Sequence, residues 1–321
     1  MSAQPVVIAH RGASGYLPEH TLEAKALAYG LGADFLEQDV VATRDHELVV
    51  LHDLYLDNVT NVAQSFPGRQ RTDGHYYVID FDLSELRALA VSERRRPGSE
   101  EPLFEQRFPV GTLGFRIATL DEEIQLIQGL NRSTGRNVGL YPEIKHPRWH
   151  FDHGVDLARL VLEKLRAYGY EHADDMVFVQ CFDAVELQRV RAELKSSLKL
   201  VQLINDDTMY RELLTRTGLA RIARYAQGLG PPYSQLVTVP KTAAGGAKLS
   251  SSRLAGEARE AGLLLHPYTF RRDRLPQYTD SLEELLVFFI SEVRVDGVFC
   301  DHPDIAVSVR NELQERLTRA R

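Results

Sequence analysis

The chain contains 321 residues, and its 45 acidic against 38 basic side chains give a net charge of −7. An acidic balance of this kind disfavours nucleic-acid binding, which depends on a basic surface. No apolar run approaches the roughly 20 residues of a membrane span, so we expect no stable membrane insertion.

Short apolar runs alternate with helical patterns along most of the chain. The strand-like runs cover residues 6–10, 35–41, 48–52, 138–145, 176–182, 198–204, 263–270 and 297–301. Helix candidates lie at residues 21–31, 121–130, 155–168, 185–194, 252–261 and 282–293. Such alternation predicts parallel strands joined by crossover helices. With this chain length it favours an α/β fold, a single (β/α)8 TIM barrel spanning residues 1–321.

Two stretches break the alternation. Residues 57–113 are polar and rich in turn-forming residues, and a structureless loop of that length is abnormal in a compact domain. We therefore expect a small inserted subdomain over one barrel face, at about residues 57–113, with the charged run at residues 93–96 as a solvated face. Residues 228–252 are predicted to be a surface loop.

The first strand-like run ends in His10 and Arg11, within the segment IAHRGASGYLPEHT. A histidine can carry a proton near neutral pH, and the planar guanidinium of arginine suits phosphate oxygens, so the pair indicates a phosphoryl-transfer site. His52 follows a second apolar run directly. Each histidine alone is more often structural, but two together can serve as general acid and base. We favour His10 as the base and His52 as the acid.

Glu37 and Asp39 are two residues apart on a predicted strand, so both side chains leave the same face. Two neighbouring carboxylates repel each other unless a cation lies between them. Glu143, at the end of another run, could supply a third oxygen ligand, and an all-oxygen set suits Ca²⁺ or Mg²⁺ rather than Zn²⁺. From spacing alone, a salt-bridged strand terminus explains the Glu-x-Asp pair equally well.

Other polar residues also lie at strand ends or in the first loop. Arg11 and Lys145 are the cations expected to meet an anionic phosphate ester, although Lys145 could simply pair with Glu143 or Glu37. Asp301 is expected to cap the helix that follows it. The remaining candidates for substrate contact are His20, Gln180 and His266.

Together these motifs resemble the glycerophosphodiester phosphodiesterases, and most closely the long periplasmic bacterial form of that family. The resemblance rests on AHRGASGYLPEHT (9–21), FLEQDVV (35–41), LVVLHDLYLD (48–57), LYPEIK (140–145), VQCFD (179–183), HPYTFR (266–271) and VDGVFCDHPD (295–304). It implies the same barrel fold, with an insertion in the same place. It also implies metal binding by Glu37, Asp39 and Glu143 and catalysis by His10 and His52.

The activity implied by the resemblance is metal-dependent hydrolysis of glycerophosphodiesters, such as glycerophosphocholine, to sn-glycerol 3-phosphate and an alcohol, in phospholipid degradation. We expect one divalent cation, Ca²⁺ before Mg²⁺, a small-molecule substrate, and a monomer or homodimer. The start MSAQPVVIAH has no basic, apolar signal region. Because the resemblance is to the periplasmic branch, we read MSA as a replaced start after a cleaved signal and expect a periplasmic location, with the cytoplasm as the alternative.

Two other functions remain open. A phospholipase D-like activity on lysolipids or sphingomyelin is possible because related barrels share the His and Glu-x-Asp arrangement, but the sequence shows no cluster of apolar loop residues for a lipid tail. A non-catalytic surface-binding protein could keep the barrel and lose the chemistry. The complete set of motifs argues against that loss.

Overall fold

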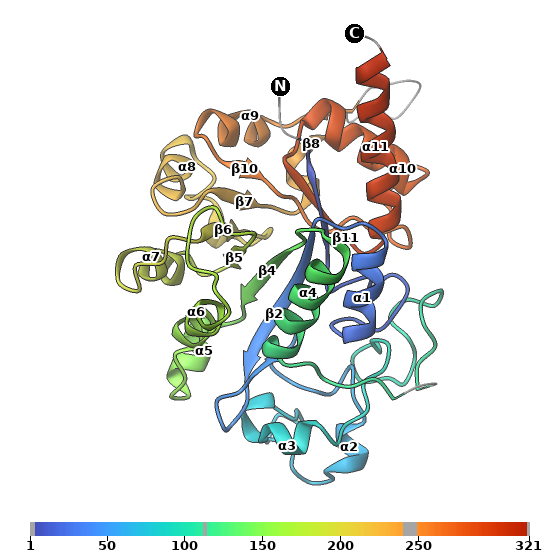
Figure 1. Cartoon of the computed structure of the whole chain (residues 1–321), viewed down its shortest axis with the longest axis vertical. Coiled ribbons are helices and arrows are strands. Elements are labelled where there is room, and N and C mark those ends of the chain that lie inside the picture. Colours follow the sequence, from blue (N-terminus) through green and yellow to red (C-terminus); the bar gives the residue numbers. More distant parts are fainter. Residues whose placement is uncertain (1–3, 112–113, 240–248, 320–321) are drawn as a thin grey trace.

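The computed structural model describes residues 4–111, 114–239 and 249–319, and this part of the chain forms a parallel β-barrel surrounded by helices (Figure 1). Neighbouring barrel strands lie in the order β10, β7, β6, β5, β4, β2, β1, β11. Backbone hydrogen bonds from Asp296 to Leu265 and from Phe270 to Phe299 join the β10 segment to β11 and close the barrel. The predicted (β/α)8 fold is confirmed. The strands are β1 (Val6–Ala9), β2 (Phe35–Ala42), β4 (Gly139–Ile144), β5 (Phe178–Cys181), β6 (Lys199–Leu203), β7 (Gly228–Gly230), β10 (Leu264–Leu265) and β11 (Gly297–Cys300).

The barrel interior is filled with large apolar side chains. Successive strand residues point to opposite faces, so on β1 Val7 belongs to the cluster between barrel and helices, whereas Ile8 belongs to a smaller inner cluster. In the inner cluster the rings of Tyr141 and Phe178 stack with centroids 5.1 Å apart. The interior is therefore a packed core.

Helices cover the outside of the barrel. Side-chain caps begin six of the described α-helices, in which a Thr, Asp or Ser oxygen accepts a hydrogen bond from a first-turn N–H group. Among the described residues, no helix is long and apolar enough to cross a membrane. The helices are α1 (Leu22–Gly30), α4 (Leu120–Thr134), α5 (Pro147–Asp152), α6 (Leu157–Ala167), α7 (Ala184–Ala192), α8 (Arg216–Ile222), α9 (Arg253–Glu260), α10 (Leu282–Phe288), its π-helical extension (Phe289–Val293) and α11 (Pro303–Arg319).

One predicted barrel strand is wrong. Leu48–Val50 forms β3, which pairs antiparallel with β2. The connection at residues 43–47 allows a hairpin but is too short for the crossover that a parallel neighbour needs. The missing barrel strand is β7, inside the stretch predicted as a surface loop, because its Gly-Leu-Gly sequence lacks the β-branched residues typical of strands. Later in that stretch β8 (Val237–Thr238) pairs with β9 (Ser250–Ser251).

Three of the sequence expectations fall partly or wholly on residues that the structure does not describe. Residues 1–3, read as a replaced start, lie outside the described residues. So do residues 240–248 of the predicted surface loop and residues 112–113 of the insertion.

The insertion packs as a separate layer beyond the end of β2, where Figure 1 shows α2 (Val62–Ser65) and α3 (Leu83–Leu86). A 3-10 turn at Val78–Asp80 lies between them in the chain. Apolar side chains of the insertion and of its start, among them Phe81 and Leu56, pack against Val41 and Val49 of the β2–β3 hairpin. Together they form a cluster separate from the main core. The insertion is thus held to the barrel by a shared apolar core.

The charged run at residues 93–96 is not the solvated face that we expected. Glu93 is only 2% exposed. The guanidinium of Arg94 is buried between the carboxylates of Glu19 and Asp53. Only Arg96 in this run has a half-exposed side chain. For Arg94 the expectation failed because its partners, Glu19 and Asp53, lie in barrel loops distant in sequence.

Candidate active site

A cavity of about 160 Å³ lies at the C-terminal ends of the barrel strands. Active sites of TIM barrels are found at this end. All of the predicted site residues except His20 and His266 line it. The lining residues are His10, Arg11, Glu37, Asp39, His52, Glu143, Lys145, Gln180, Phe182, Leu203, Tyr268, Thr269, Arg271 and Phe299.

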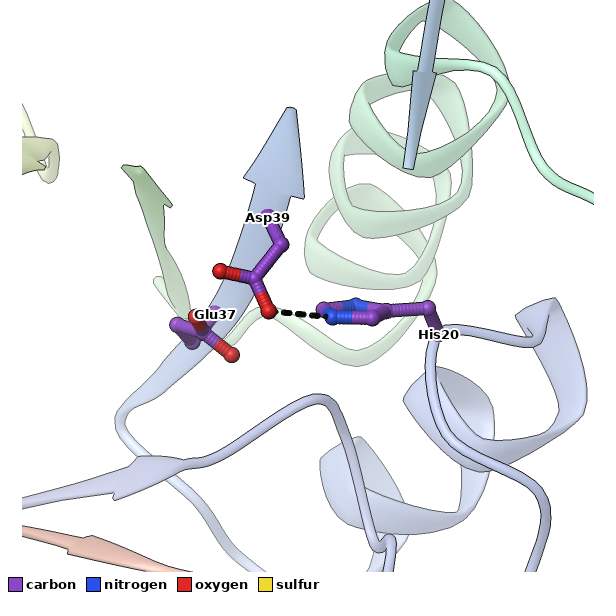
Figure 2. Close-up of side chains that lie close together, drawn as sticks. All are labelled: His20, Glu37 and Asp39. Atoms are coloured by element: carbon purple, nitrogen blue, oxygen red, sulfur yellow. Dashed lines mark hydrogen bonds and ion pairs between the residues drawn. The ribbon is translucent and has the colours of Figure 1, made fainter. Parts of the chain in front are cut away.

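The three predicted metal ligands meet because of strand register. Glu37 and Asp39 leave β2 on the same side (Figure 2). Asp39 is the register partner of Glu143 on β4, and Glu143 is the register partner of Gln180 on β5. All three carboxylates are buried, Glu143 being the most exposed at 6%. Adjacent strands therefore place three carboxylates and one amide in a single polar patch.

Burial and mutual repulsion make this patch unfavourable for negative charge. Burial, and then the nearby Asp39, raise the pKa of Glu37 well above its usual range. Burial also raises the pKa of Glu143 to about 7. Burial acts in the same direction on Asp39, but Lys145 and neighbouring histidines hold its pKa well below normal. Carboxylates with raised pKa values gain most from a cation placed among them.

The donor set fits a hard divalent cation. Ligand atoms of Glu37 and Asp39 lie within 4.8 Å of each other and of a ring nitrogen of His20, and Glu143 lines the same cavity as the two carboxylates. Among the described residues, the side-chain oxygen of Gln180 is buried without a hydrogen-bond partner, and its side chain lines the same cavity. Carboxylate and amide oxygens are typical ligands of Ca²⁺ and Mg²⁺. The site can therefore bind a divalent metal ion.

His20 supports Asp39 and does not line the cavity. Figure 2 shows its ring approaching Asp39, and the His20 Nε2 to Asp39 Oδ2 distance is 2.7 Å. His266 lies in the barrel interior, where its Nδ1 is 2.8 Å from the hydroxyl of Tyr141. The structure thus brings neither of these predicted substrate contacts to the cavity wall.

Two cations border the carboxylates. The Nζ of Lys145 lies 2.9 Å from Glu143 Oε1 and 3.4 Å from Asp39 Oδ1. The backbone of Arg11 is left-handed (φ 56°), which is uncommon for a residue with a side chain, and its N–H donates to Glu37 Oε2 at 2.6 Å. Its side chain contacts Glu19 at 2.9 Å. The ion pair between Lys145 and Glu143 is present, and both cations also line the cavity.

Each predicted catalytic histidine is held by an aspartate. His10 Nδ1 lies 2.7 Å from Asp301 Oδ1, and His52 Nδ1 lies 2.6 Å from Asp53 Oδ1. Because a carboxylate only accepts, Nδ1 of each ring carries the proton and Nε2 keeps a free lone pair. Burial lowers the pKa of His10 to about 4 and that of His52 to about 3. Both rings are therefore neutral at pH 7 and able to accept a proton.

The groups that hold these aspartates were not predicted from the sequence. Asp301 was expected to cap a helix, which is wrong, because both of its oxygens are bound by His10, Arg107 and Arg271. Its position at the end of the last strand is the signal that could have revealed this role. Arg94, which binds Asp53, lies in the insertion, where no local pattern marks it.

Buried carboxylates beside two aspartate-bound histidines at the mouth of a TIM barrel define an enzyme site suited to a metal ion and to proton transfer. The chain matches the model of the "Glycerophosphoryl diester phosphodiesterase family" over residues 10–305. It belongs to this family.

Individual relatives agree with this assignment. The chain is 40% identical to a glycerophosphodiester phosphodiesterase of Haemophilus influenzae, over 96% of this chain and 90% of that protein. It is 37% identical to one of Treponema pallidum, over 95% and 92% respectively. A phosphodiesterase of Oleispira antarctica, solved in complex with the product sn-glycerol-3-phosphate, has a similar fold, with a TM-score of 0.65, 20% identity and coverage of 96% of this chain and 97% of that chain.

Proposed function

We propose that the protein hydrolyses glycerophosphodiesters, such as glycerophosphocholine and glycerophosphoethanolamine, to sn-glycerol 3-phosphate and an alcohol. The observation that carries the proposal is one cavity in which three carboxylates, two cations and two aspartate-bound histidines converge. Support comes from family membership, from the names of relatives at 37–40% identity and from the product bound to the Oleispira antarctica enzyme.

We propose one divalent cation held by Glu37, Asp39 and Glu143, with Ca²⁺ favoured and Mg²⁺ as the alternative. Ca²⁺ tolerates irregular sets of six to eight oxygen ligands, whereas Mg²⁺ demands near-ideal octahedral geometry. When bound, the ion would supply positive charge for a phosphate oxygen and ligand positions for the glycerol hydroxyls. Gln180 would complete the oxygen set through its free side-chain oxygen.

Arg11 and Lys145 would then hold the phosphate group. Both side chains reach the cavity, and the guanidinium fork and the ammonium group suit non-bridging phosphate oxygens. Burial alone would lower the pKa of Lys145, but Asp39 and Glu143 raise it above its usual value. Lys145 therefore stays charged and can offset charge that develops on the phosphoryl oxygens.

The two histidines would move the protons of the reaction. In the proposed first step, Nε2 of His10 takes the proton of the glycerol hydroxyl next to the phosphoester, and that oxygen bonds to phosphorus. The bond from phosphorus to the alcohol oxygen breaks, and His52 returns a proton to the alcohol; although His52 is neutral in the free protein, the bound anionic diester would raise its pKa and favour its protonated form. Water then opens the cyclic phosphate: His52 takes a proton from the attacking water, the bond from phosphorus to the neighbouring glycerol oxygen breaks, and His10 returns its proton to that oxygen, which gives glycerol 3-phosphate and restores both rings. Intramolecular attack gains up to about 7–11 kcal/mol from proximity.

The alcohol half would leave through a larger hollow that adjoins the cavity. This hollow has a volume of about 1360 Å³, shares His52, Lys145 and Phe182 with the cavity, and is also lined by Trp149 and Tyr210. Because this hollow is wide and open, we expect weak specificity for the alcohol group. Rates for choline, ethanolamine and glycerol esters are expected to lie within about tenfold of one another, or about 1.4 kcal/mol.

The experiment that tests this function is turnover of glycerophosphocholine in Ca²⁺, with released glycerol 3-phosphate measured by a coupled dehydrogenase. Turnover is expected, together with loss of most of the rate for a deoxy analogue that lacks the hydroxyl next to the phosphoester. Absence of turnover in both Ca²⁺ and Mg²⁺ would contradict the function. Equal rates for the analogue and its parent would contradict intramolecular attack alone.

We also propose a periplasmic location and a role in phospholipid degradation. The support is the resemblance of the motifs to the long periplasmic form of the family. Osmotic-shock fractionation of the natural host, followed by immunodetection, tests the location. Recovery with the cytoplasmic fraction would contradict it.

A further inference from the structure

Two arginines of the insertion reach the barrel mouth and bind the aspartates that hold the histidines. The first, Arg94, donates through Nη1 to Asp53 Oδ2 at 2.6 Å and through Nη2 to Glu19 Oε1 at 2.6 Å. Its Nε donates to the other Glu19 oxygen at 3.0 Å. The side chain is only 11% exposed. All three nitrogens of the guanidinium are thus committed to these two carboxylates.

The second arginine, Arg107, binds Asp301, the aspartate that holds His10. Its Nη2 donates to Asp301 Oδ2 at 2.7 Å, and Nε and Nη2 together bind Asp273 at 2.6 and 3.0 Å. Nη1 donates to the backbone oxygen of Ser14 at 3.1 Å. The guanidinium also stacks on Phe104, with its carbon 3.7 Å from the ring centroid. The side chain is 5% exposed.

The two arrangements follow one plan. In each, one oxygen of an aspartate binds Nδ1 of a histidine and the other oxygen binds an arginine of the insertion. A carboxylate held at both oxygens cannot rotate about its terminal bond. The ring that it binds therefore keeps one orientation, and Nδ1 keeps its proton.

Neither arginine is placed to bind substrate. Both border a second cavity of about 200 Å³ between the insertion and the barrel, which also touches His10 and His52. Neither lines the cavity that holds the carboxylate patch, whereas Arg11 lines both. Each guanidinium nitrogen of Arg94 and Arg107 already donates to a protein oxygen.

We propose that the insertion positions both catalytic histidines, with Arg94 acting on His52 through Asp53 and Arg107 acting on His10 through Asp301. This inference rests on the proposed function for the roles of His10 and His52. Arg94 and Arg107 are positioning residues, since they act only through an aspartate.

The two aspartates differ in the number of arginines that bind them. Asp301 is also bound by the Nε of Arg271, at 2.8 Å. Among the residues that the structure describes, Arg94 is the one arginine or lysine paired with Asp53. Loss of Arg94 is therefore expected to affect the reaction more than loss of Arg107.

The test uses Arg94→Met, Arg107→Met and the matched control Arg69→Met, in the full chain with saturating Ca²⁺ and glycerophosphocholine. Arg69 lies in the same insertion, pairs with Glu85 and stacks on Phe81, but contacts neither aspartate. We expect kcat to fall about 10- to 100-fold for Arg94→Met, as for a small misplacement of a catalytic group, and less for Arg107→Met. KM should change less than threefold, and Arg69→Met should stay within twofold of wild type.

Crossed backgrounds separate positioning from general damage to the fold. Arg94→Met added to His52→Ala should lower kcat no further, because the ring that it positions is gone. Added to His10→Ala, Arg94→Met should lower kcat by the same factor as in the wild-type background. Equal reductions in the two backgrounds would overturn the proposal. Arg94→Lys should recover only part of the rate, since an ammonium group cannot bridge Glu19 and Asp53 as a planar fork does.

A second readout does not depend on activity. A histidine Nδ1–H bonded to a carboxylate gives a proton resonance far downfield, and wild type should show such a signal for His52. We expect Arg94→Met to lose or broaden that signal and Arg69→Met to keep it, with both variants still folded by circular dichroism. An unchanged signal in Arg94→Met would overturn the proposal. Wild type that shows the signal but no turnover would instead contradict the proposed function.

Discussion

The ends of the barrel strands and the insertion border the same catalytic mouth but contribute different groups to it. The strand ends present the side chains that can meet a substrate, among them Glu37, Asp39 and Glu143. The insertion contributes Arg94 and Arg107, which bind other side chains and not the reaction cavity. Reacting groups thus come from rigid, regularly spaced elements, while a long irregular segment holds their supports in place.

The first way to sharpen this comparison is to remove the metal. Excess EDTA should abolish turnover, and Ca²⁺ or Mg²⁺, but not Zn²⁺, should restore it, because the barrel offers oxygen ligands. Glu37→Gln should weaken metal binding by at least about 10²-fold in calorimetry, on the scale at which metal sites respond to lost partners. The matched change Glu85→Gln in the insertion should leave metal binding unaltered. Full turnover in EDTA would contradict the metal site.

Replacing the histidines should have the next largest effect. His10→Ala and His52→Ala should each lower kcat by about 10²- to 10⁴-fold, the usual contribution of one general acid or base. His75 of the insertion stacks on Tyr55, with centroids 4.2 Å apart, and does not line the reaction cavity. If His75→Ala lowered kcat as much as His10→Ala and His52→Ala do, the proposed difference in role between barrel and insertion would be wrong.

The two regions should also differ in what an ion pair contributes to stability. Lys25 and Glu123 are fully buried behind β2, with Nζ 2.7 Å from Oε2. Lys25→Met leaves Glu123 unpaired in the core, so the free energy of unfolding should fall by about 3–5 kcal/mol. Arg69→Met breaks a partly exposed pair, which should cost at most about 1 kcal/mol. Urea unfolding curves measure both, and equal losses would contradict the difference.

The smallest expected effect is a dependence of stability on pH that originates in the insertion. Burial, and then the charge of Glu19, raise the pKa of Glu93 from 4.5 to about 8. The folded state therefore binds a proton that the unfolded state releases, and the free energy of unfolding falls as pH rises from 4.5 to 8. Glu93→Gln should remove this slope and raise the free energy of unfolding at pH 8, since each unit of pKa difference is worth about 1.4 kcal/mol. An unchanged slope in Glu93→Gln would contradict the assignment of this pH dependence to Glu93.

The same contrast explains what could be predicted from the sequence. Glu37 and Asp39 stand two apart in an apolar run, and His10 and His52 each end one, so local spacing places all four at the barrel mouth. The barrel itself follows from alternation of strand and helix patterns. These features depend on neighbours in the chain, which a sequence displays directly.

Features that depend on distant contacts were mispredicted. The apolar run that forms β3 was predicted as a barrel strand but belongs to a hairpin, and the barrel strand β7 was predicted as part of a loop. Strand pairing depends on connection length and on neighbouring strands, and an apolar run alone does not reveal it. The buried position of Arg94 depends on the carboxylates of Glu19 and Asp53, and Asp53 lies more than 40 residues away in the chain. Charge in an irregular segment has no periodicity that could reveal such partners.

The most direct test of the central claim is ³¹P NMR of glycerophosphocholine turned over by the wild-type protein in Ca²⁺. The account predicts that the bond from phosphorus to the choline oxygen breaks, so the resonance of sn-glycerol 3-phosphate should grow, with a cyclic phosphate signal before it if the second step is slow. Addition of EDTA should stop the growth. Accumulation of phosphocholine, which requires cleavage on the glycerol side, would contradict the account.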